Sequence, residues 1–266
     1  MCMIRFLIII SFIFSQNIAS EENLKVIRTA NNTGSTFTGV YDPISQAYVE
    51  FAARDLNPTL EIGAGRGATV TELVKQREFL KNSANVVVND ISNQHLNEAL
   101  KNYPNLNNTN VTMLPGAFPW DLNFPKATFN SILTSRVFHF LTPEEWQTGL
   151  NKIFIWLKEG GRLYITTGSY FIPHQKDNIK LIETKKESGV LWPATFKSGK
   201  EAYGPDSHSG FANLVDKEIL ERELKLAGFE ILQIDYLDFR DLLPADSCLD
   251  GREVVEAIAI KPIREK

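Results

Sequence analysis

One stretch decides the fold of this chain: Thr59-Leu60-Glu61-Ile62-Gly63-Ala64-Gly65-Arg66-Gly67. A short apolar run carries an acid near its end, and three glycines follow at alternate positions. The run predicts a buried strand, because short apolar segments bounded by glycine are typical of strands covered on both faces. Glycine permits a sharp turn and lets a ligand lie against the main chain. A helix is expected to begin near Ala68 and to direct its free N–H groups at the same place. We therefore expect a nucleotide-like ligand at the carboxyl end of this strand.

The rest of the chain alternates strand and helix signals. Apolar runs predict further strands at 85–90, 111–114, 129–134, 162–166, 229–236 and 253–260, and helical periodicity predicts helices from Pro43, at 68–80, 93–103, 142–157 and 215–227. Such alternation implies a parallel sheet covered on both faces. The last two strands have no helix between them, which indicates a closing antiparallel pair. The predicted fold is α/β and Rossmann-like, with a seven-stranded, mostly parallel sheet, helices on both faces and an antiparallel last strand.

Residues 168–213 interrupt this alternation with many aromatic side chains among mixed charges. A long aromatic segment between a strand and a helix is more often a lid or a pocket wall than a spacer. Its aromatic rings could enclose a substrate or form a small core of their own. No linker divides the chain, so residues 41–266 are predicted to form one domain that carries an insertion at 168–213.

The first twenty residues have the order of a secretory signal peptide. A basic start with Arg5 is followed by the apolar run 6–14 and by a short polar region that ends in small residues at Ser20. The apolar run is shorter than the roughly twenty residues that span a bilayer. We expect export after cleavage at Ser20, into a periplasm or out of the cell; an uncleaved membrane anchor is the alternative. Residues 21–40 are expected to be a flexible lead-in.

Composition narrows the classes of partner. Removing residues 1–20 takes away Arg5 and no acid, so the formal net charge moves from −4 to −5. An acidic chain is a poor candidate for non-specific nucleic-acid binding, which depends on Lys and Arg neutralising phosphates. Cys248 then remains as a single cysteine, and no Cys/His cluster has metal-ligand spacing. Neither nucleic acid nor a metal is expected as a partner, and the oligomeric state stays open.

Three kinds of nucleotide-binding site are alternative interpretations of the glycine turn. A phosphate-binding P-loop requires Gly-Lys-Ser/Thr, whereas this chain has Gly67-Ala68-Thr69. A dinucleotide fingerprint is satisfied loosely by Gly63-x-Gly65-x-x-Ala68, with Asp90 as a ribose ligand. Its first strand, however, starts only after a polar tail and a leading helix.

The third interpretation covers more of the chain. The stretch 61–67 resembles the acidic-x-Gly-x-Gly-x-Gly motif of class I S-adenosylmethionine-dependent methyltransferases. Asp90, which closes the second strand, matches the acid that binds the ribose hydroxyls in that family. Residues 129–141 look like the family's fourth strand and its approach to the next helix, and 157–163 is similar to its L-K-x-G-G-x-L segment. The resemblance extends over about 40–262 and leaves the insertion unmatched.

The resemblance implies S-adenosylmethionine as cofactor. It places Glu61 near the methionine amino group, through water or the loop, and Asp90 at the ribose. The sequence departs from the family after the third strand, where an acid is common and Gly116-Ala117-Phe118 stands, and at Asn130, where Asp is common. The adenine could still be held by the backbone of Ala117 and Phe118, with the Phe118 ring against the base. The cofactor-binding residues are expected to be Tyr41, Glu61, Gly63, Ala64, Gly65, Asp90, Ile91, Ala117, Phe118 and Ser135.

Candidate catalytic residues follow the fourth strand and open the insertion. Methyl transfer needs the nucleophile and the methyl group held in line with water excluded, and a base only where the nucleophile starts protonated. Arg136 could hold an anionic group of the substrate or form a surface ion pair. His139 could be a base, although Phe138 and Phe140 favour a packed structural histidine. Tyr170 is the third candidate, and His95 is interpreted as a surface residue.

The sequence therefore predicts an S-adenosylmethionine-dependent methyltransferase that acts on a small-molecule or peptide-like substrate. Export conflicts with a cofactor that is made in the cytoplasm. Two alternatives stay open: a secreted, non-catalytic binding module on this scaffold, and an NAD(P)-dependent oxidoreductase.

Overall fold

A computed structural model describes residues 26–28, 35–37, 42–108, 110–205, 207–240 and 248–264 of the chain. Its centre is a seven-stranded sheet of order β10-β11-β7-β6-β3-β4-β5. The strands are β3 (Thr59–Ile62), β4 (Val86–Asp90), β5 (Val111–Pro115), β6 (Phe129–Ser135), β7 (Leu157–Gly168), β10 (Glu230–Leu237) and β11 (Val254–Ile260). The pairs among β3 to β7 are parallel, and β11 runs antiparallel to both of its neighbours. The predicted fold class is confirmed.

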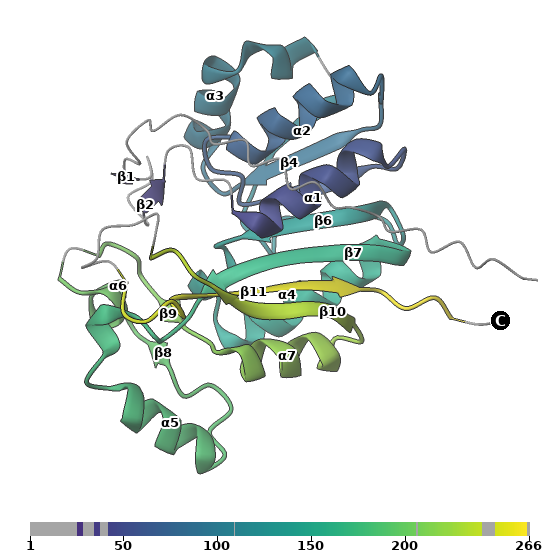
Figure 1. Ribbon diagram of the computed structural model, residues 1–266. Helices are drawn as coiled ribbons and strands as arrows, with labels where there is room; N and C mark the ends of the chain where they lie inside the picture. Colours follow the sequence, from purple (N-terminus) through teal and green to yellow (C-terminus); the bar gives the residue numbers. More distant parts are fainter. Residues whose placement is uncertain are drawn as a thin grey trace, which may run out of the picture.

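Helices cover the sheet on both faces (Figure 1). On one face lie α1 (Pro43–Arg54), α2 (Ala68–Phe79) and α3 (Asn93–Asn102), whose apolar sides pack on β4 and on the middle of the sheet. On the other face lie α4 (Pro143–Trp156) and α7 (Lys217–Leu226), which enclose a larger core with β3, β6, β7 and β11. The short η1 (Pro104–Asn108) and η2 (Phe138–Phe140) complete this part of the chain.

The strand β7 begins earlier than the sequence predicts. Helix α4 ends at Trp156 and the strand starts at Leu157, whereas the sequence predicts a strand from 162. The pairing of β6 with β7 jumps from Phe129–Leu157 to Ser131–Arg162, so a bulge absorbs the residues between them. Gly160 in this bulge has a φ of +76°, a conformation that glycine adopts without a steric penalty.

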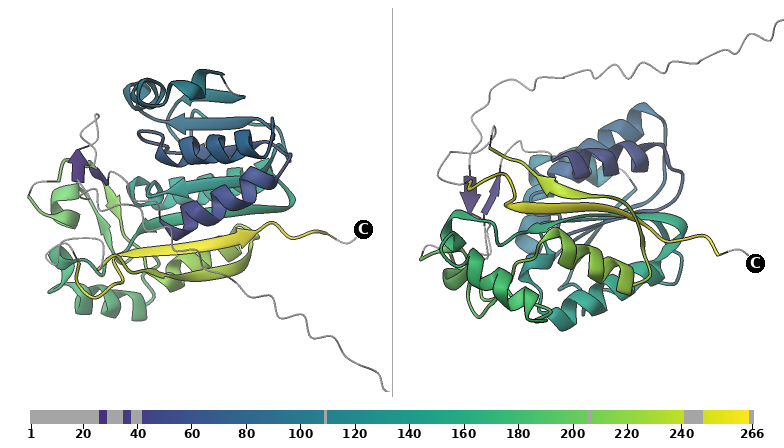
Figure 2. Two further views of the ribbon diagram at one scale, coloured as in Figure 1. Left: turned by 45° about the horizontal axis from the view of Figure 1, so that its top comes forward. Right: turned by 60° about the horizontal axis from the view of Figure 1, so that its bottom comes forward.

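The segment between β7 and α7 forms a separate layer. It contains η3 (Pro173–Gln175), α5 (Ile179–Glu187), β8 (Thr195–Phe196), α6 (Gly199–Tyr203) and β9 (Ala212–Asn213). The views agree that this layer lies beyond the carboxyl ends of the parallel strands, opposite the end where the C-terminal segment leaves (Figures 1 and 2). It has a core of its own, built from Tyr170, Phe171, Ile182, Ala194, Ala202, Ala212 and Leu214.

The short strands β1 (Val26–Arg28) and β2 (Ser35–Phe37) pair antiparallel at this same end of the molecule (Figure 2). The predicted leader 1–20 lies outside the described residues. Among the residues that are described, no helix combines the length and the apolar character that crossing a membrane requires.

Candidate functional site

The glycine turn after β3 is built from three positions with positive φ. Gly63 has a φ of +73°, and a Cβ atom there would lie 2.2 Å from Cγ2 of Val137. Gly67 has a φ of +81°, and a Cβ atom there would lie 2.7 Å from Cβ of Ala99. Gly65 differs, because a Cβ atom at this position would meet nothing within 4 Å. Two of the glycines therefore serve packing, and Gly65 has open space where a side chain would stand.

The helix that follows this turn has no side-chain cap, and the backbone of Val70 in its first turn is a hydrogen-bond partner of Glu61. Gly67 occupies the N-cap position of α2 and supplies no side-chain hydrogen bond. The backbone of Ala64 is held from the other side, since its N–H donates to the Asn89 carbonyl at 2.9 Å. The turn and this helix end form the floor of the candidate site.

Glu61 is the buried acid of the site. Its side chain is 4% exposed, and its Oε2 atom has no hydrogen-bond partner. Burial is the largest influence on the carboxyl group and raises its pKa to about 8; the Thr69 side chain opposes this, and the charges of Asp90 and Asp42 add to it. A buried carboxyl oxygen without a partner is costly unless a donor or cation reaches it. Glu61 is thus prepared to receive a cationic group.

Asp90, at the end of β4, is oriented by three donors. Oδ2 accepts from the Gly65 N–H at 2.8 Å, and Oδ1 accepts from the Ser92 N–H at 2.8 Å. Nδ1 of His95 lies 3.0 Å from Oδ1. The sequence interpretation of His95 as a surface residue is wrong, because the ring is only 3% exposed. Ser92 caps α3, which brings the third residue of that helix over the end of β4.

In the loop after β5, Ala117 and Phe118 make contacts with the protein itself that the sequence does not predict. The Ala117 N–H donates to Oδ2 of Asp121 at 2.8 Å, an acid that the sequence interpretation passed over. The expected placement of the Phe118 ring against a base is wrong. The ring is buried against Phe138 and Trp156, in a space that Gly149 of α4 leaves for it. In contrast, Ile91 is 65% exposed beside Asp90, so its apolar surface is open to a flat ligand.

Ser135 and Arg136 stand at the carboxyl end of β6. The Ser135 hydroxyl donates to Oδ2 of Asp42 at 3.3 Å and lies 3.2 Å from Oγ1 of Thr166. Arg136 has a φ of +56°, a conformation that non-glycine residues rarely adopt, and its N–H donates to the Thr166 carbonyl at 2.9 Å. Burial lowers the pKa of Arg136, and the charge of Asp42 opposes that effect. Strained backbone of this kind is concentrated at functional sites.

His139 is packed, and its lone pair is already used. Nδ1 accepts from the Gly168 N–H at 3.3 Å, and the ring lies against Phe140 and Tyr203. Burial, followed by the nearby charge of Arg136, lowers the pKa of His139 to about 3. A neutral imidazole in this tautomer carries its proton on Nε2. The side chain is therefore suited to donating a hydrogen bond rather than to accepting a proton.

Tyr170 is not brought together with the other candidates. Its hydroxyl lies 2.6 Å from Oε1 of Glu183, in the insertion, and 2.6 Å from Oδ2 of Asp216, which caps α7. Lys186 joins this group, with Nζ 2.6 Å from Asp216 and 3.0 Å from Glu183. These contacts fasten the insertion to the start of α7. Tyr41, another predicted contact, lies outside the described residues.

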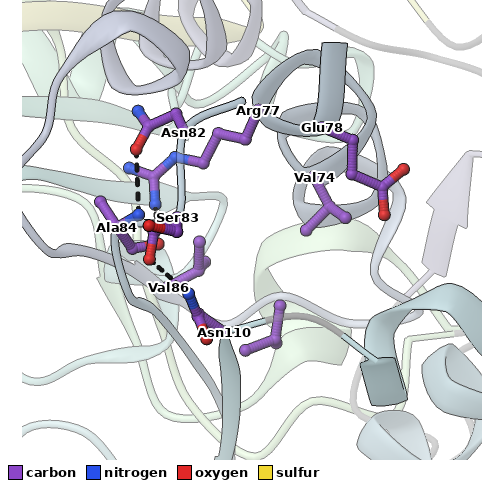
Figure 3. A pocket seen from close by; sticks show the side chains of 9 residues that line it. Val74, Arg77, Glu78, Asn82, Ser83, Ala84, Val86 and Asn110 are labelled. Atoms are coloured by element: carbon purple, nitrogen blue, oxygen red, sulfur yellow. Dashed lines mark hydrogen bonds between the residues drawn. The ribbon is translucent and has the colours of Figure 1, made fainter. Parts of the chain in front are cut away.

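A small cavity of about 40 Å³ lies away from the glycine turn, between α2 and the amino ends of β4 and β5 (Figure 3). Its lining includes Arg77, whose guanidinium donates to the carbonyls of Ala52, Ala84 and Asn85. Because these carbonyls already engage its donors, the cavity belongs to the packing of the fold. Within the described part of the chain, no three His, Cys, Asp or Glu side chains gather as a metal site would require.

Comparisons with known proteins agree with this geometry. A family model described as a methyltransferase domain matches residues 59–161. No curated protein sequence matches the chain significantly. Solved structures share the fold at low sequence identity, and at this level of identity the likeness concerns the fold alone.

Three of these structures represent the group. An S-adenosylmethionine-dependent methyltransferase from Mesorhizobium loti has a TM-score of 0.57 at 14% identity, with 82% of this chain and 97% of that one covered. A methyltransferase from Methanosarcina mazei gives 0.55 at 17% identity, with 85% and 99% covered. The 1,6-didemethyltoxoflavin-N1-methyltransferase of Burkholderia thailandensis, solved with 1,6-didemethyltoxoflavin and S-adenosylhomocysteine bound, gives 0.53 at 14% identity, with 84% and 80% covered. The match over residues 59–161 is to a methyltransferase domain, and over most of its length the chain shares the fold of these solved methyltransferases.

Proposed function

We propose that this protein binds S-adenosylmethionine and transfers its methyl group to a small-molecule or peptide-like acceptor. The observation that carries the proposal is the buried, unpartnered Oε2 of Glu61 beside the open space at Gly65. A pyrophosphate at this turn would meet a carboxyl group and gain nothing from it. An amino acid end with a cationic ammonium would give that oxygen its partner.

Different residues would bind different parts of the cofactor. Asp90 is already fixed by the Gly65 and Ser92 N–H groups, and its carboxylate would accept the ribose hydroxyls. Ile91 would cover one face of the adenine, and Glu61 would hold the ammonium group. When bound, the cofactor supplies a methyl group on a positively charged sulfur. The protein's task is then to align an acceptor and to exclude water.

The acceptor site is proposed to lie between the ends of β6 and β7 and the insertion. Substrates of open α/β sheets bind at the carboxyl ends of the strands, and the insertion lies over that edge (Figure 1). The structure of the Burkholderia neighbour holds bound 1,6-didemethyltoxoflavin, which supports a small-molecule acceptor for this chain.

Calorimetry tests the cofactor assignment directly. S-adenosylhomocysteine and NAD are titrated separately into the purified chain, and binding of the first without a signal from the second is expected. Binding of NAD alone would point to an oxidoreductase, and a chain that binds neither would contradict the proposal. The exposed Asp235→Asn variant, on the edge strand β10, is a matched control that should bind as the parent does.

Export is proposed as a separate property, from the order of residues 1–20 alone. The intact mass of the protein recovered from its natural host tests it. A mass that corresponds to a chain starting at Glu21 is expected, and a full-length mass would leave an uncleaved anchor as the answer.

A further inference from the structure

We propose that Glu256 is a catalytic proton acceptor and that the acceptor substrate is an amine, bound at the end of β7 between Glu256 and Tyr203. This inference rests on the proposed function, because it names the substrate class of the same site. Glu256 belongs to β11, which lies outside the matched region 59–161.

The register of the sheet places Glu256 at the site. In the antiparallel pair of β11 with β7, Glu256 is opposite Thr166, and Thr166 is paired in turn with Ser135 of β6. Paired residues direct their side chains to the same face of a sheet. The three side chains therefore form one polar row, on the face where Ser135 reaches Asp42 at the start of α1.

Glu256 is a buried acid with an oxygen to spare. The residue is 5% exposed; Oε1 accepts from Nε2 of Gln233 at 3.2 Å, and Oε2 has no partner. Burial, followed by the charge of Asp42, raises the pKa of the carboxyl group to about 7. The charged groups that face it are Asp42 from the start of α1 and Asp235 from β10, and both disfavour a second negative charge. A base whose pKa lies near neutral pH is well matched to proton transfer.

A second unpartnered group lies one step along the same face. The Tyr203 hydroxyl of α6 is buried without a partner and lies 3.4 Å from where a Cβ atom of Gly168 would stand. Gly168 is opposite Val254 in the pairing, so it is the diagonal neighbour of Glu256, about 7–8 Å away. Burial raises the pKa of Tyr203, so its hydroxyl stays a donor. A proton acceptor and a proton donor, each without a partner, thus lie on the same face of the sheet near the end of β7.

The surrounding charges favour an amine over an acid as acceptor. Asp42, Glu61 and Glu256 are buried acids on this face of the sheet, and Arg136 is the cation beside Asp42. His139 is excluded as the base because its Nδ1 is used by the Gly168 N–H. An ammonium group would give Oε2 of Glu256 its partner, whereas a carboxylate would be repelled by the same groups.

In the proposed step Glu256 takes a proton from the acceptor ammonium, and the methyl group then moves to the freed nitrogen. The N–H bond of the acceptor ammonium breaks, and the proton moves to Oε2 of Glu256. The freed nitrogen lone pair forms the new N–C bond while the S–C bond breaks, and its electron pair stays on sulfur. The methylated amine leaves as its ammonium, and Glu256 passes its proton to solvent.

Glu256→Gln is the decisive variant, because it keeps the shape and removes the charge. Benzylamine, benzyl alcohol and benzoate are titrated by calorimetry into the complex with S-adenosylhomocysteine. We expect only benzylamine to bind, with an affinity about tenfold lower in Glu256→Gln, and S-adenosylhomocysteine to bind all variants equally. Glu230→Gln, at an exposed position of β10, is the matched control. Tyr203→Phe should weaken benzylamine binding as well.

Two further readouts separate this inference from the proposed function. Infrared difference spectra of the protein should show a protonated carboxyl band that titrates near pH 7 and is missing in Glu256→Gln. The kcat/KM for amine methylation should rise through the same pH range in the parent only. Failure to bind S-adenosylhomocysteine would sink the proposed function. Three outcomes with normal cofactor binding would overturn the role of Glu256 alone. They are no binding of benzylamine, a preference for benzoate or benzyl alcohol, and equal affinity for benzylamine in the parent and in Glu256→Gln.

Discussion

Residues 59–95 and the insertion meet the same edge of the sheet, but different kinds of contact hold them there. In 59–95 the contacts are between main-chain N–H groups and one carboxylate, Asp90, which sits on the next strand. In the insertion they are contacts of the Tyr170 hydroxyl and the Lys186 ammonium with the carboxylate of Asp216, at the start of α7. Main-chain contacts at a glycine turn tolerate few substitutions, whereas a side-chain network can be rebuilt with other residues. This difference fits the proposal that the first region binds the cofactor and that the second contacts the acceptor.

Removal of the Asp90 carboxylate should have the largest effect. Asp90→Ala leaves the Gly65 and Ser92 N–H groups without their acceptor and takes away the proposed ribose ligand. Hydrogen bonds to a charged group contribute about 1.5–3 kcal/mol each, so the Kd for S-adenosylhomocysteine should rise by about 100-fold or more. Calorimetry measures this, and an unchanged Kd would show that the first region does not bind the ribose.

Removal of the Asp216 carboxylate should act on the second region only. Asp216 caps α7 through the Ile219 N–H and binds Lys186. Burial alone would raise the pKa of Asp216, but the hydrogen bonds from Lys186 and Tyr170 lower it below its ordinary value. Asp216→Ala should cost about 2 kcal/mol of unfolding free energy, from the lost cap and the lost charged hydrogen bonds. Urea denaturation measures the loss, and the Kd for S-adenosylhomocysteine should stay within a factor of two.

The stabilisation that the Asp216 carboxylate contributes to the fold should be lost in acid. A carboxyl group whose pKa is lowered by folding stabilises the fold above its unfolded pKa, and this contribution is lost as the pH falls through the folded value. Acid should therefore weaken the anchor of the insertion in the parent, but not in Asp216→Ala. Limited proteolysis between pH 7 and pH 3 tests the point.

Glu61 should make cofactor binding depend on pH in the opposite, basic range. Its pKa of about 8 means that the group is mostly protonated at pH 6, whereas an ammonium partner needs the carboxylate. Binding then releases a proton, and the affinity for S-adenosylhomocysteine should rise by about tenfold per pH unit up to pH 8. In Glu61→Gln this slope should vanish. Calorimetry in buffers of different ionisation enthalpy would detect the released proton, and a flat profile in the parent would contradict the assignment.

Gly65→Ala should have the smallest effect on stability. A Cβ atom at this position has open space, so the cost is that of an alanine at positive φ, about 1–2 kcal/mol. Gly63→Ala should cost more, because its Cβ atom would overlap Val137. Comparison of the two denaturation curves separates the glycine that faces a ligand from the glycine that packs. Equal losses would mean that Gly65 has no special place in the site.

The sequence predicts the sheet well because its central strands are covered on both faces. Strands β3, β4 and β6 read as short apolar runs, and the glycines and Asp90 mark where two of them end. The position of the Phe118 ring could not be read in this way. It depends on Gly149, thirty-one residues later, which leaves room for the ring only when α4 is packed on the sheet.

Contacts between side chains of different elements are also not predictable from the sequence. His95 looks like a polar residue on an amphipathic helix, and its burial follows from its contact with Asp90 five residues earlier. The capping Ser92 was the one local signal, since it fixes which residue of α3 faces the strand end. Tyr203 and Glu256 lie far from the glycine turn in sequence. The register of β7 with β11 makes Glu256 the diagonal neighbour of Gly168, and the packing of α6 brings the Tyr203 hydroxyl to Gly168.

The contact between His95 and Asp90 gives the protein a built-in spectroscopic reporter. The imidazole is buried and touches the carboxylate that a ribose would engage, so its ring proton and nitrogen resonances respond to any change in that carboxylate. Only four histidines occur in the chain, which makes the signals easy to assign by single substitution. Nuclear magnetic resonance of ¹⁵N-labelled histidine can therefore follow occupancy of the proposed nucleoside site directly, in mixtures and without a methylation assay.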